Sequence, residues 1–247
     1  MPSRWTVRLP RMDATRVTPE QVHAVVSGWF DTAPGAHEQQ RKAYSVSLPR
    51  PTGDHTVIGI GLVDDRLVDP LHTGAGRGRR LRFGSQTTVL DRDPCQTHGI
   101  PWAELNKPSA ATSWSLRFVT LTTFRRGNAF TPNPGLKPIL GSLRQVWRAS
   151  APPELPPLVL ELTPEPVWLT AIDVSSRTTR VNDLLVSGFT GRLRFACDGP
   201  PAVVAAVDRL VRLSAYAGVG AYTTRGFGVV RVESTDRSPR LQPSGSR

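Results

Sequence analysis

The stretch Gly218-Val219-Gly220-Ala221-Tyr222-Thr223-Thr224-Arg225-Gly226-Phe227-Gly228 lies near the C-terminal end of the chain. It holds two Gly-x-Gly pairs separated by five residues, so that four positions without a Cβ fall within one short turn. Glycine takes left-handed backbone angles without steric cost, and successive amide donors in such a turn can form an anion-binding concavity. We therefore expect this glycine loop to bind a polyanion.

Two other interpretations of the loop stay open. A dinucleotide-binding loop follows a strand and opens a helix, whereas here an apolar-periodic run from Ala202 to Ala217 predicts a helix before the glycines and residues 228–232 predict a strand after them. A nucleotide-dependent enzyme or transferase would nevertheless bind a free nucleotide at this loop. The purely structural interpretation is a helix C-cap followed by a glycine-bulged strand, for which a single glycine would be enough.

The loop resembles the C-terminal motif G-φ-G-x5-G-φ-G of the RAMP superfamily of CRISPR proteins. Three further stretches are similar to elements of one RAMP family, the Cas6 endoribonucleases that process precursor crRNA: Phe118 to Arg125, Ser142 to Trp147, and Gly188 to Phe195. The resemblance is clearest over the second half of the chain. It implies an RNA-binding protein with a metal-independent nuclease activity.

Composition and charge agree with a nucleic-acid partner. The 247 residues carry 31 lysines and arginines against 20 acidic residues, a net charge of +11, and most of the excess is arginine. The planar arginine fork suits bidentate phosphate contacts and stacking on bases. No run of about eighteen apolar residues could span a bilayer and no basic-then-apolar signal segment is visible, so we expect a cytoplasmic protein without membrane contact.

The predicted order of elements repeats itself along the chain. Residues 5–9 alternate as a half-buried strand, Thr18-Pro19-Glu20-Gln21 begins a helix with a capping box, and residues 44–62 form a hairpin. Strand, helix, strand, strand is half of a ferredoxin-like unit, and residues 114–232 predict a related series. The expected fold is therefore α+β, with tandem ferredoxin-like (RRM-like) domains and a C-terminal glycine-rich loop.

We place the domain boundary near residue 112. The expected units are residues 1–112, an N-terminal ferredoxin-like domain with the candidate catalytic histidine, residues 113–236, a C-terminal RAMP domain with the glycine loop, and residues 237–247, a disordered tail. Within the first unit we expect a helix over 64–71, a mobile basic loop over 74–79 and a connecting region over 94–108. Within the second we expect strands over 158–162, 167–174, 182–187 and 192–195.

Few residues are candidates for chemistry. The chain has five histidines, two cysteines without paired spacing, and no metal-binding or serine-nucleophile motif, so we expect neither a metal nor a cofactor. The segment Ala36 to Ser45 resembles the Cas6 segment in which a catalytic histidine precedes a strand that carries a lysine. That match implies His37 as general acid/base and Lys42 as its cationic helper. His23, on the first helix, is the second candidate.

The residues predicted to contact RNA belong to the glycine loop and to basic loops and strands: Gly218, Gly220, Tyr222, Arg225, Gly226, Gly228, Arg125, Arg126, Arg77, Arg79, Arg80, Arg192 and Arg194.

The function implied by the resemblance is cleavage of CRISPR precursor RNA within the repeat, to give mature crRNAs with 2′,3′-cyclic phosphate and 5′-hydroxyl ends. RNA supplies its own nucleophile in the 2′-hydroxyl, so such an enzyme needs proton transfer and charge stabilisation rather than a metal. The alternative is a non-catalytic RAMP subunit that holds crRNA in a CRISPR effector complex. The sequence leaves open whether the protein acts as a monomer or a homodimer.

Overall fold

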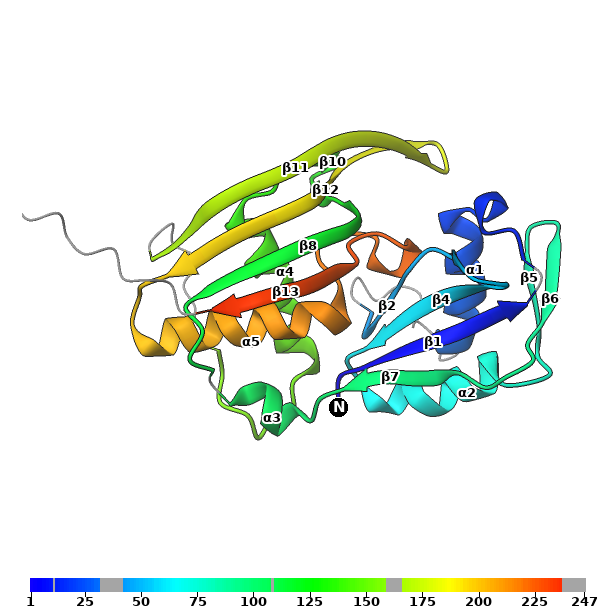
Figure 1. Ribbon diagram of the computed structural model, residues 1–247, viewed down its shortest axis with the longest axis horizontal. Coiled ribbons are helices and arrows are strands. Elements are labelled where there is room, and N and C mark those ends of the chain that lie inside the picture. The colour runs from blue at the N-terminus through cyan, green and yellow to red at the C-terminus, as the bar shows by residue number, and fades with distance from the viewer. Residues whose placement is uncertain (11, 32–41, 108, 159–165, 237–247) are drawn as a thin grey trace, which may run out of the picture.

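The computed structural model describes residues 1–10, 12–31, 42–107, 109–158 and 166–236. Two antiparallel sheets lie side by side, one from each half of the chain (Figure 1). Helices α1 and α2 pack on the first sheet, and helices α4 and α5 pack on the second.

The first half forms a five-stranded sheet in the order β2-β4-β1-β7, in which β3 also pairs with β4. Strands β5 and β6 form a separate hairpin. The elements of this half are β1 (Ser3–Pro10), α1 (Pro19–Phe30), β2 (Tyr44–Val46), β3 (Arg50–Thr52), β4 (His55–Leu62), α2 (Val68–Ala75), β5 (Arg80–Phe83), β6 (Gln86–Val89), β7 (Cys95–Gly99) and α3 (Trp102–Asn106).

The second half forms a four-stranded sheet in the order β11-β12-β8-β13, with β9 and β10 as a small hairpin. Its elements are β8 (Ser113–Thr122), β9 (Phe124–Arg126), β10 (Ala129–Thr131), α4 (Leu136–Ser150), β11 (Val167–Val181), β12 (Leu184–Cys197), α5 (Pro201–Ala217) and β13 (Val230–Asp236). In both sheets the first and third strands of a strand-helix-strand-strand-helix-strand series are central. This is the ferredoxin-like arrangement, so the predicted fold class is confirmed.

Local sequence signals explain the first elements well. Side chains of β1 alternate between buried and half-buried positions, as expected for a strand with one face on the core. Helix α1 begins at the predicted capping box, in which Thr18 accepts a hydrogen bond from the Gln21 amide and Gln21 accepts one from the Thr18 amide. Pro19 occupies the first turn, where its missing N–H costs nothing.

Three expectations about secondary structure are wrong. The expected connecting region 94–108 contains β7 and α3. Strand β7 forms through backbone pairing with β1, and because most of its residues are exposed, its sequence shows no alternation of apolar residues. The strands expected at 182–187 and 192–195 form one strand, β12, which continues through a register shift near Gly191. The helix expected at 64–71 begins later, because Asp64 caps a short 3-10 turn, Asp65–Leu67, that precedes α2. The strand expected at 158–162 falls mostly outside the described residues.

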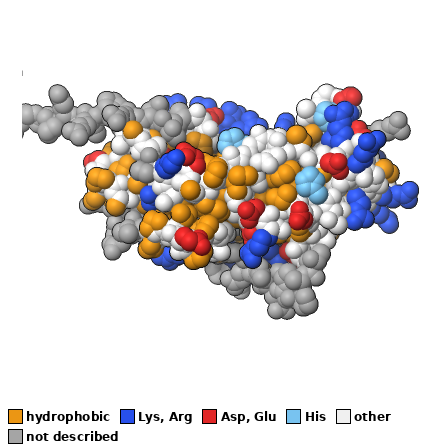
Figure 2. Space-filling model, turned by 90° about the horizontal axis from the view of Figure 1, so that it is seen from below, with side chains coloured by type: hydrophobic (Ala, Val, Ile, Leu, Met, Phe, Trp, Pro, Cys, Tyr) orange, Lys and Arg blue, Asp and Glu red, His pale blue; other side chains and the backbone are white. Residues whose placement is uncertain are grey.

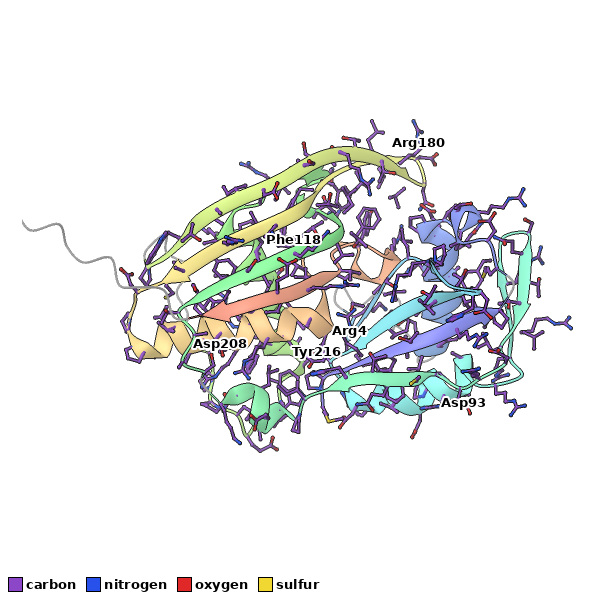
Figure 3. All side chains as sticks on the ribbon, viewed as in Figure 1. Arg4, Asp93, Phe118, Arg180, Asp208 and Tyr216 are labelled. Carbon is purple, nitrogen blue, oxygen red and sulfur yellow. The ribbon has the colours of Figure 1, made fainter. Side chains whose placement is uncertain are left out.

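The second half contains a buried polar group that fixes its helices. Asp208, fully buried on α5, accepts hydrogen bonds from the Trp114 indole at 3.1 Å and from the Arg212 guanidinium at 2.9 Å. Arg212 also donates to the Leu105 carbonyl at 2.8 Å, so that one charged network joins α5, β8 and the end of α3. Figure 3 shows Asp208 on the helix and Phe118 on the sheet that the helix covers.

We predict that Asp208→Ala lowers the free energy of unfolding by about 3–5 kcal/mol, because it leaves the Trp114 N–H and the Arg212 charge without their buried acceptor. Urea denaturation followed by tryptophan fluorescence measures this. Glu154→Ala, at an exposed position, serves as the control and should change the free energy by less than about 0.5 kcal/mol. A loss below about 1 kcal/mol for Asp208→Ala would contradict the assigned role.

Candidate functional site

The glycine loop connects α5 to β13 and packs tightly against its surroundings. All four glycines have positive φ angles, between +68° and +88°. An added Cβ would lie 2.3 Å from the Thr123 carbonyl oxygen at Gly220 and 2.1 Å from the Val219 carbonyl oxygen at Gly228. At Gly226 it would lie 2.5 Å from the Leu48 side chain, which belongs to the first half of the chain. Both steric space and backbone angle therefore require glycine here.

Most amides of the loop are already used inside the protein. The Gly218 amide donates to the Ser214 carbonyl, Ala221 to Thr123, and Gly228 to Leu121, at 2.8–3.1 Å. Gly218 and Gly228 are also buried. The structure therefore gives these two glycines a packing role, and their predicted contact with RNA stays a prediction.

The middle of the loop, Tyr222 to Arg225, is its half-exposed part. Tyr222 takes the left-handed conformation, with φ of 60°, and its ring stacks on Phe130 of β10 at a centroid distance of 4.7 Å. The Arg225 guanidinium lies over the same ring, 4.8 Å from its centroid. Arg225 is thereby held by a cation–π contact that leaves its N–H donors available to an anion.

Helix α1 brings His23 to this part of the loop. Burial is the main cause that lowers the pKa of His23, and the Arg225 charge lowers it further, although a hydrogen bond with the Thr224 backbone works in the opposite direction. Within the described part of the chain, the Nδ1 atom of His23 is buried without a hydrogen-bond partner. His23 is therefore a mostly neutral imidazole at pH 7, beside a fixed arginine.

A buried ion pair lies near the other end of α1. Lys42 Nζ is 3.0 Å from Asp31 Oδ2, and the two side chains are 13% and 4% exposed. Burial, together with the nearby Asp31 carboxylate, raises the pKa of Tyr44. The Lys42 charge also contributes to lowering the pKa of His23, so these groups share one site. His37 lies outside the described residues, and its predicted role stays a prediction.

The predicted arginines fall into three places. Arg125 and Arg126 lie on β9, whose hairpin partner β10 carries the Phe130 that stacks on Tyr222. Arg192 and Arg194 lie on β12, and Arg192 is bound to Glu233 at 2.5 Å. Arg77, Arg79 and Arg80 lie at the far end of the first half, beside β5. The loop expected over 74–79 is shorter than predicted, because residues 74 and 75 belong to α2. The Gly78 amide donates to the Leu90 carbonyl and Arg79 Nε to the Thr73 carbonyl, and the predicted mobility stays a prediction.

Sequence reasoning predicted Arg192 but missed its cross-strand neighbours Arg117 and Arg231, and also Arg4 of the first half. Arg192, Arg117 and Arg231 lie in register across three adjacent strands, and the last of them approaches Arg4 of β1. Burial lowers the pKa of Arg4, and the charges of Arg231 and Arg50 lower it further. Tyr216 of α5 lies beside Arg4 (Figure 3). Alternation of arginine with apolar residues in β8 and β13 was the available signal.

Arg4 borders a narrow cleft between the two halves. Small and polar residues line the rest of it: Ser45, Val46, Ser47, Gly59, Gly61, Ser214, Ala215, Gly218, Val229 and Val230. In the described residues no carboxylate forms an ion pair with Arg4, Arg50 or Arg231. Converging like charges without a counter-charge favour an anionic ligand.

The described residues contain no group of three histidine, cysteine, aspartate or glutamate side chains that could hold a metal ion. None of their helices is long and apolar enough to cross a membrane.

Residues 116–230 match the family described as CRISPR-associated endoribonuclease Cas6. A CRISPR-associated endoribonuclease Cas6 from Streptococcus thermophilus is 26% identical over 130 residues, which are 52% of this chain and 54% of the relative. A Cas6 product complex superposes with a TM-score of 0.80 at 22% identity, over 94% of this chain and 99% of the other. These findings support a Cas6 family protein.

The Cas6 likeness extends over nearly the whole described fold. Thermus thermophilus Cas6 superposes with a TM-score of 0.69 at 21% identity, covering 94% of this chain and 98% of that one. The structural matches therefore include the first half, where the sequence resemblance is weak. The sequence match spans only about half the length of the curated relative.

We predict that Gly220→Ala lowers the melting temperature more than Gly127→Ala does. Both glycines have positive φ, but a Cβ at Gly127 meets no atom within 4 Å, whereas at Gly220 it meets the Thr123 carbonyl oxygen. The difference between the two variants in differential scanning calorimetry isolates the steric part, which we expect to be on the order of 1–3 kcal/mol. Equal melting temperatures would mean that the loop relaxes freely.

We predict that the pKa of His23 in the free protein lies below the usual value of about 6.5 and rises in the Arg225→Gln variant. Burial remains in the variant but one nearby positive charge is removed, which favours protonation of the imidazole. An NMR titration of the imidazole protons measures both values. Arg125→Gln, an exposed arginine on β9, is the control and should leave the His23 pKa unchanged. No upward shift with Arg225→Gln would contradict the assigned contact.

Proposed function

We propose that this protein is a metal-independent endoribonuclease that cleaves CRISPR precursor RNA once within each repeat and leaves 2′,3′-cyclic phosphate and 5′-hydroxyl ends. One observation carries the proposal: a neutral histidine, a buried lysine and a fixed arginine, from both halves of the chain, converge beside the glycine loop. The likeness to Cas6 product and substrate-mimic complexes supports the RNA substrate.

The reaction needs two proton transfers and one change of bond at phosphorus. The 2′-hydroxyl loses its proton to a base and its oxygen bonds to phosphorus, while the bond from phosphorus to the 5′-oxygen breaks and that oxygen gains a proton. Histidine side chains perform such transfers near neutral pH. Arg225 and Lys42 would stabilise the charge that develops on the phosphorane oxygens.

We propose His37 as the principal acid/base and His23 as the second group. Residues 32–41 join Asp31 to Lys42, whose side chains are in contact, so His37 is five residues from a member of the cluster. We further propose that the chain divides near residue 112, between α3 and β8, so that the site lies between two domains.

The uncompensated arginines supply the rest of the proposed RNA groove. Arg4 lines the cleft, and the charges of Arg50 and Arg231 act on it. Arg125, Arg126 and Arg194 extend the basic surface on the second half. Phosphate contacts of this kind give affinity that is spread over many groups and falls with salt. We propose that the partner is the repeat RNA and that the mature crRNA is kept for a CRISPR effector complex.

We predict that the wild-type protein cleaves repeat RNA from its own CRISPR locus in the presence of EDTA, and that His37→Ala slows single-turnover cleavage by about 10²-fold or more. Affinity should stay near that of the wild type, and Lys42→Ala should lose less rate. Mass spectrometry of the 5′ fragment should identify the cyclic phosphate.

The same assay separates the alternatives. Loss of cleavage with EDTA and its return with magnesium would contradict the metal-independent mechanism. Normal cleavage by His37→Ala together with loss in His23→Ala would assign the chemistry to α1. Tight binding without cleavage under any metal condition would identify the protein as a non-catalytic crRNA-binding subunit.

A further inference from the structure

The hairpin of β5 and β6 carries a basic surface at the end of the molecule away from the second half. Residues 77–93 contain five arginines and two aspartates. Figure 2 shows lysine and arginine side chains gathered at this end. The arginines are all exposed: Arg77, Arg79, Arg80, Arg82 and Arg92.

Nearby carboxylates do not neutralise these arginines. Asp91 lies 3.7 Å from Arg8 of β1, and Asp93 accepts a hydrogen bond from the Arg77 amide at 2.8 Å. Among the described residues none of the five guanidinium groups forms an ion pair. The local charge is therefore open to an external anion.

Two of the guanidinium groups are held in place by the backbone. Arg79 Nε donates to the Thr73 carbonyl at 2.7 Å, and Arg82 Nε donates to the Gly84 carbonyl at 2.9 Å. Each group uses one of its five N–H donors in this way, and the remaining donors stay available. Fixing the side chain in advance reduces the entropy lost when a ligand binds.

The hairpin geometry aligns the arginines. Leu81 and Phe83 are buried, so Arg80 and Arg82 share the outward face of β5. Residues two apart on a strand are separated by about 6.8 Å, which suits contacts to neighbouring phosphates of one strand.

A groove adjoins this surface between α1, α2 and β5. Its volume is about 530 Å³, and it is lined by Gly28, Trp29, Asp69, Pro70, Thr73, Gly74, Arg79, Arg80 and Leu81. Gly74 lets α2 pack closely on Trp29, because a Cβ there would lie 2.3 Å from the indole ring. Gly28 lies five residues beyond His23 on α1, and five residues turn the helix by about 140°, so the groove lies on a different side of α1 from His23.

We propose that this hairpin and groove form a second RNA-binding surface, which holds the phosphate backbone of the repeat RNA beyond the cleavage site. The inference rests on the proposed function, and it assigns to this surface the part of the RNA that extends beyond the cleavage site. The ligand chemistry is a phosphodiester backbone, which either the paired stem or the single-stranded flank of the repeat could supply.

A matched pair of variants tests the proposal. Arg80→Gln/Arg82→Gln removes two charges from the hairpin, and Arg66→Gln/Arg148→Gln removes two exposed charges elsewhere, so both reduce the net charge from +11 to +9. Filter binding of repeat RNA between 50 and 300 mM salt measures affinity and its salt dependence. For the hairpin variant we expect about tenfold weaker binding and a logarithmic salt slope smaller by about 2, since each phosphate contact contributes about 1. The control should match the wild type in slope.

Further arms of the experiment locate the RNA and separate the two proposals. Two shortened RNAs are compared, one reduced to the stem and one reduced to the single-stranded flank. The hairpin variant should bind more weakly than the control to only one of them, and that RNA contains the part that the surface contacts. Cleavage at saturating protein should be unchanged in the Arg66→Gln/Arg148→Gln control. If wild type binds RNA but the two variants agree in affinity and slope, the hairpin surface is not an RNA site and an acidic protein partner becomes the alternative. If the wild type binds no repeat RNA at all, the proposed function itself fails.

Discussion

The backbone of the glycine loop can pass so close to its neighbours only because its four glycines have no Cβ. The positions of the neighbouring helices and strands depend on that close approach. Gly220 and Gly228 press against backbone carbonyls, and Gly226 presses against Leu48. Through these contacts the loop fixes the end of α5, the start of β13 and the approach of β2 from the other half. The half-exposed segment from Tyr222 to Arg225 is presented to α1 because the glycines on both sides are buried. A loop that is required for packing thus also positions the cationic side of the candidate site.

The arginines of the fold are of two kinds, those paired with an acidic residue inside the protein and those without such a partner among the described residues. The buried network around Asp208 is neutralised internally, as expected for a structural ion pair. Arg4 and Arg231 instead approach each other with no acidic ion-pair partner among the described residues, and the exposed arginines of β5 and β6 likewise have none there. Such arrangements lower the stability of the free protein slightly and increase its attraction for a polyanion. On the proposed function, the paired arginines are structural and the unpaired ones bind RNA.

Much of the fold could be predicted from local patterns, since these depend on neighbouring residues. The capping box at Thr18 and the alternation of β1 are examples in which sequence neighbours determine the structure. Strand β7 could not be found in this way, because it has no buried face and exists through its pairing with β1. The long strand β12 was divided in the prediction because glycine usually marks a break, whereas Gly191, with φ of 128°, accommodates a register shift inside the strand. The site was predictable only in its list of residue types. His23 lies near Arg225, and Arg4 near Arg231, only because the two halves of the chain pack together; the members of each pair are more than two hundred residues apart in sequence.

The electrostatics of the cleft constrain how the two proposed proton transfers are divided. A histidine whose pKa is lowered by burial and by Arg225 is neutral at pH 7, so it is suited to accept the proton of the 2′-hydroxyl and is poorly suited to donate one to the leaving 5′-oxygen. Lys42 is held by Asp31 at 3.0 Å, so on the proposed function its role is to stabilise negative charge on the phosphate. On the proposed function, the acid must therefore come from a group in a different environment from that of His23. We propose that His37, in the segment that joins Asp31 to Lys42, supplies that proton while His23 acts as the base.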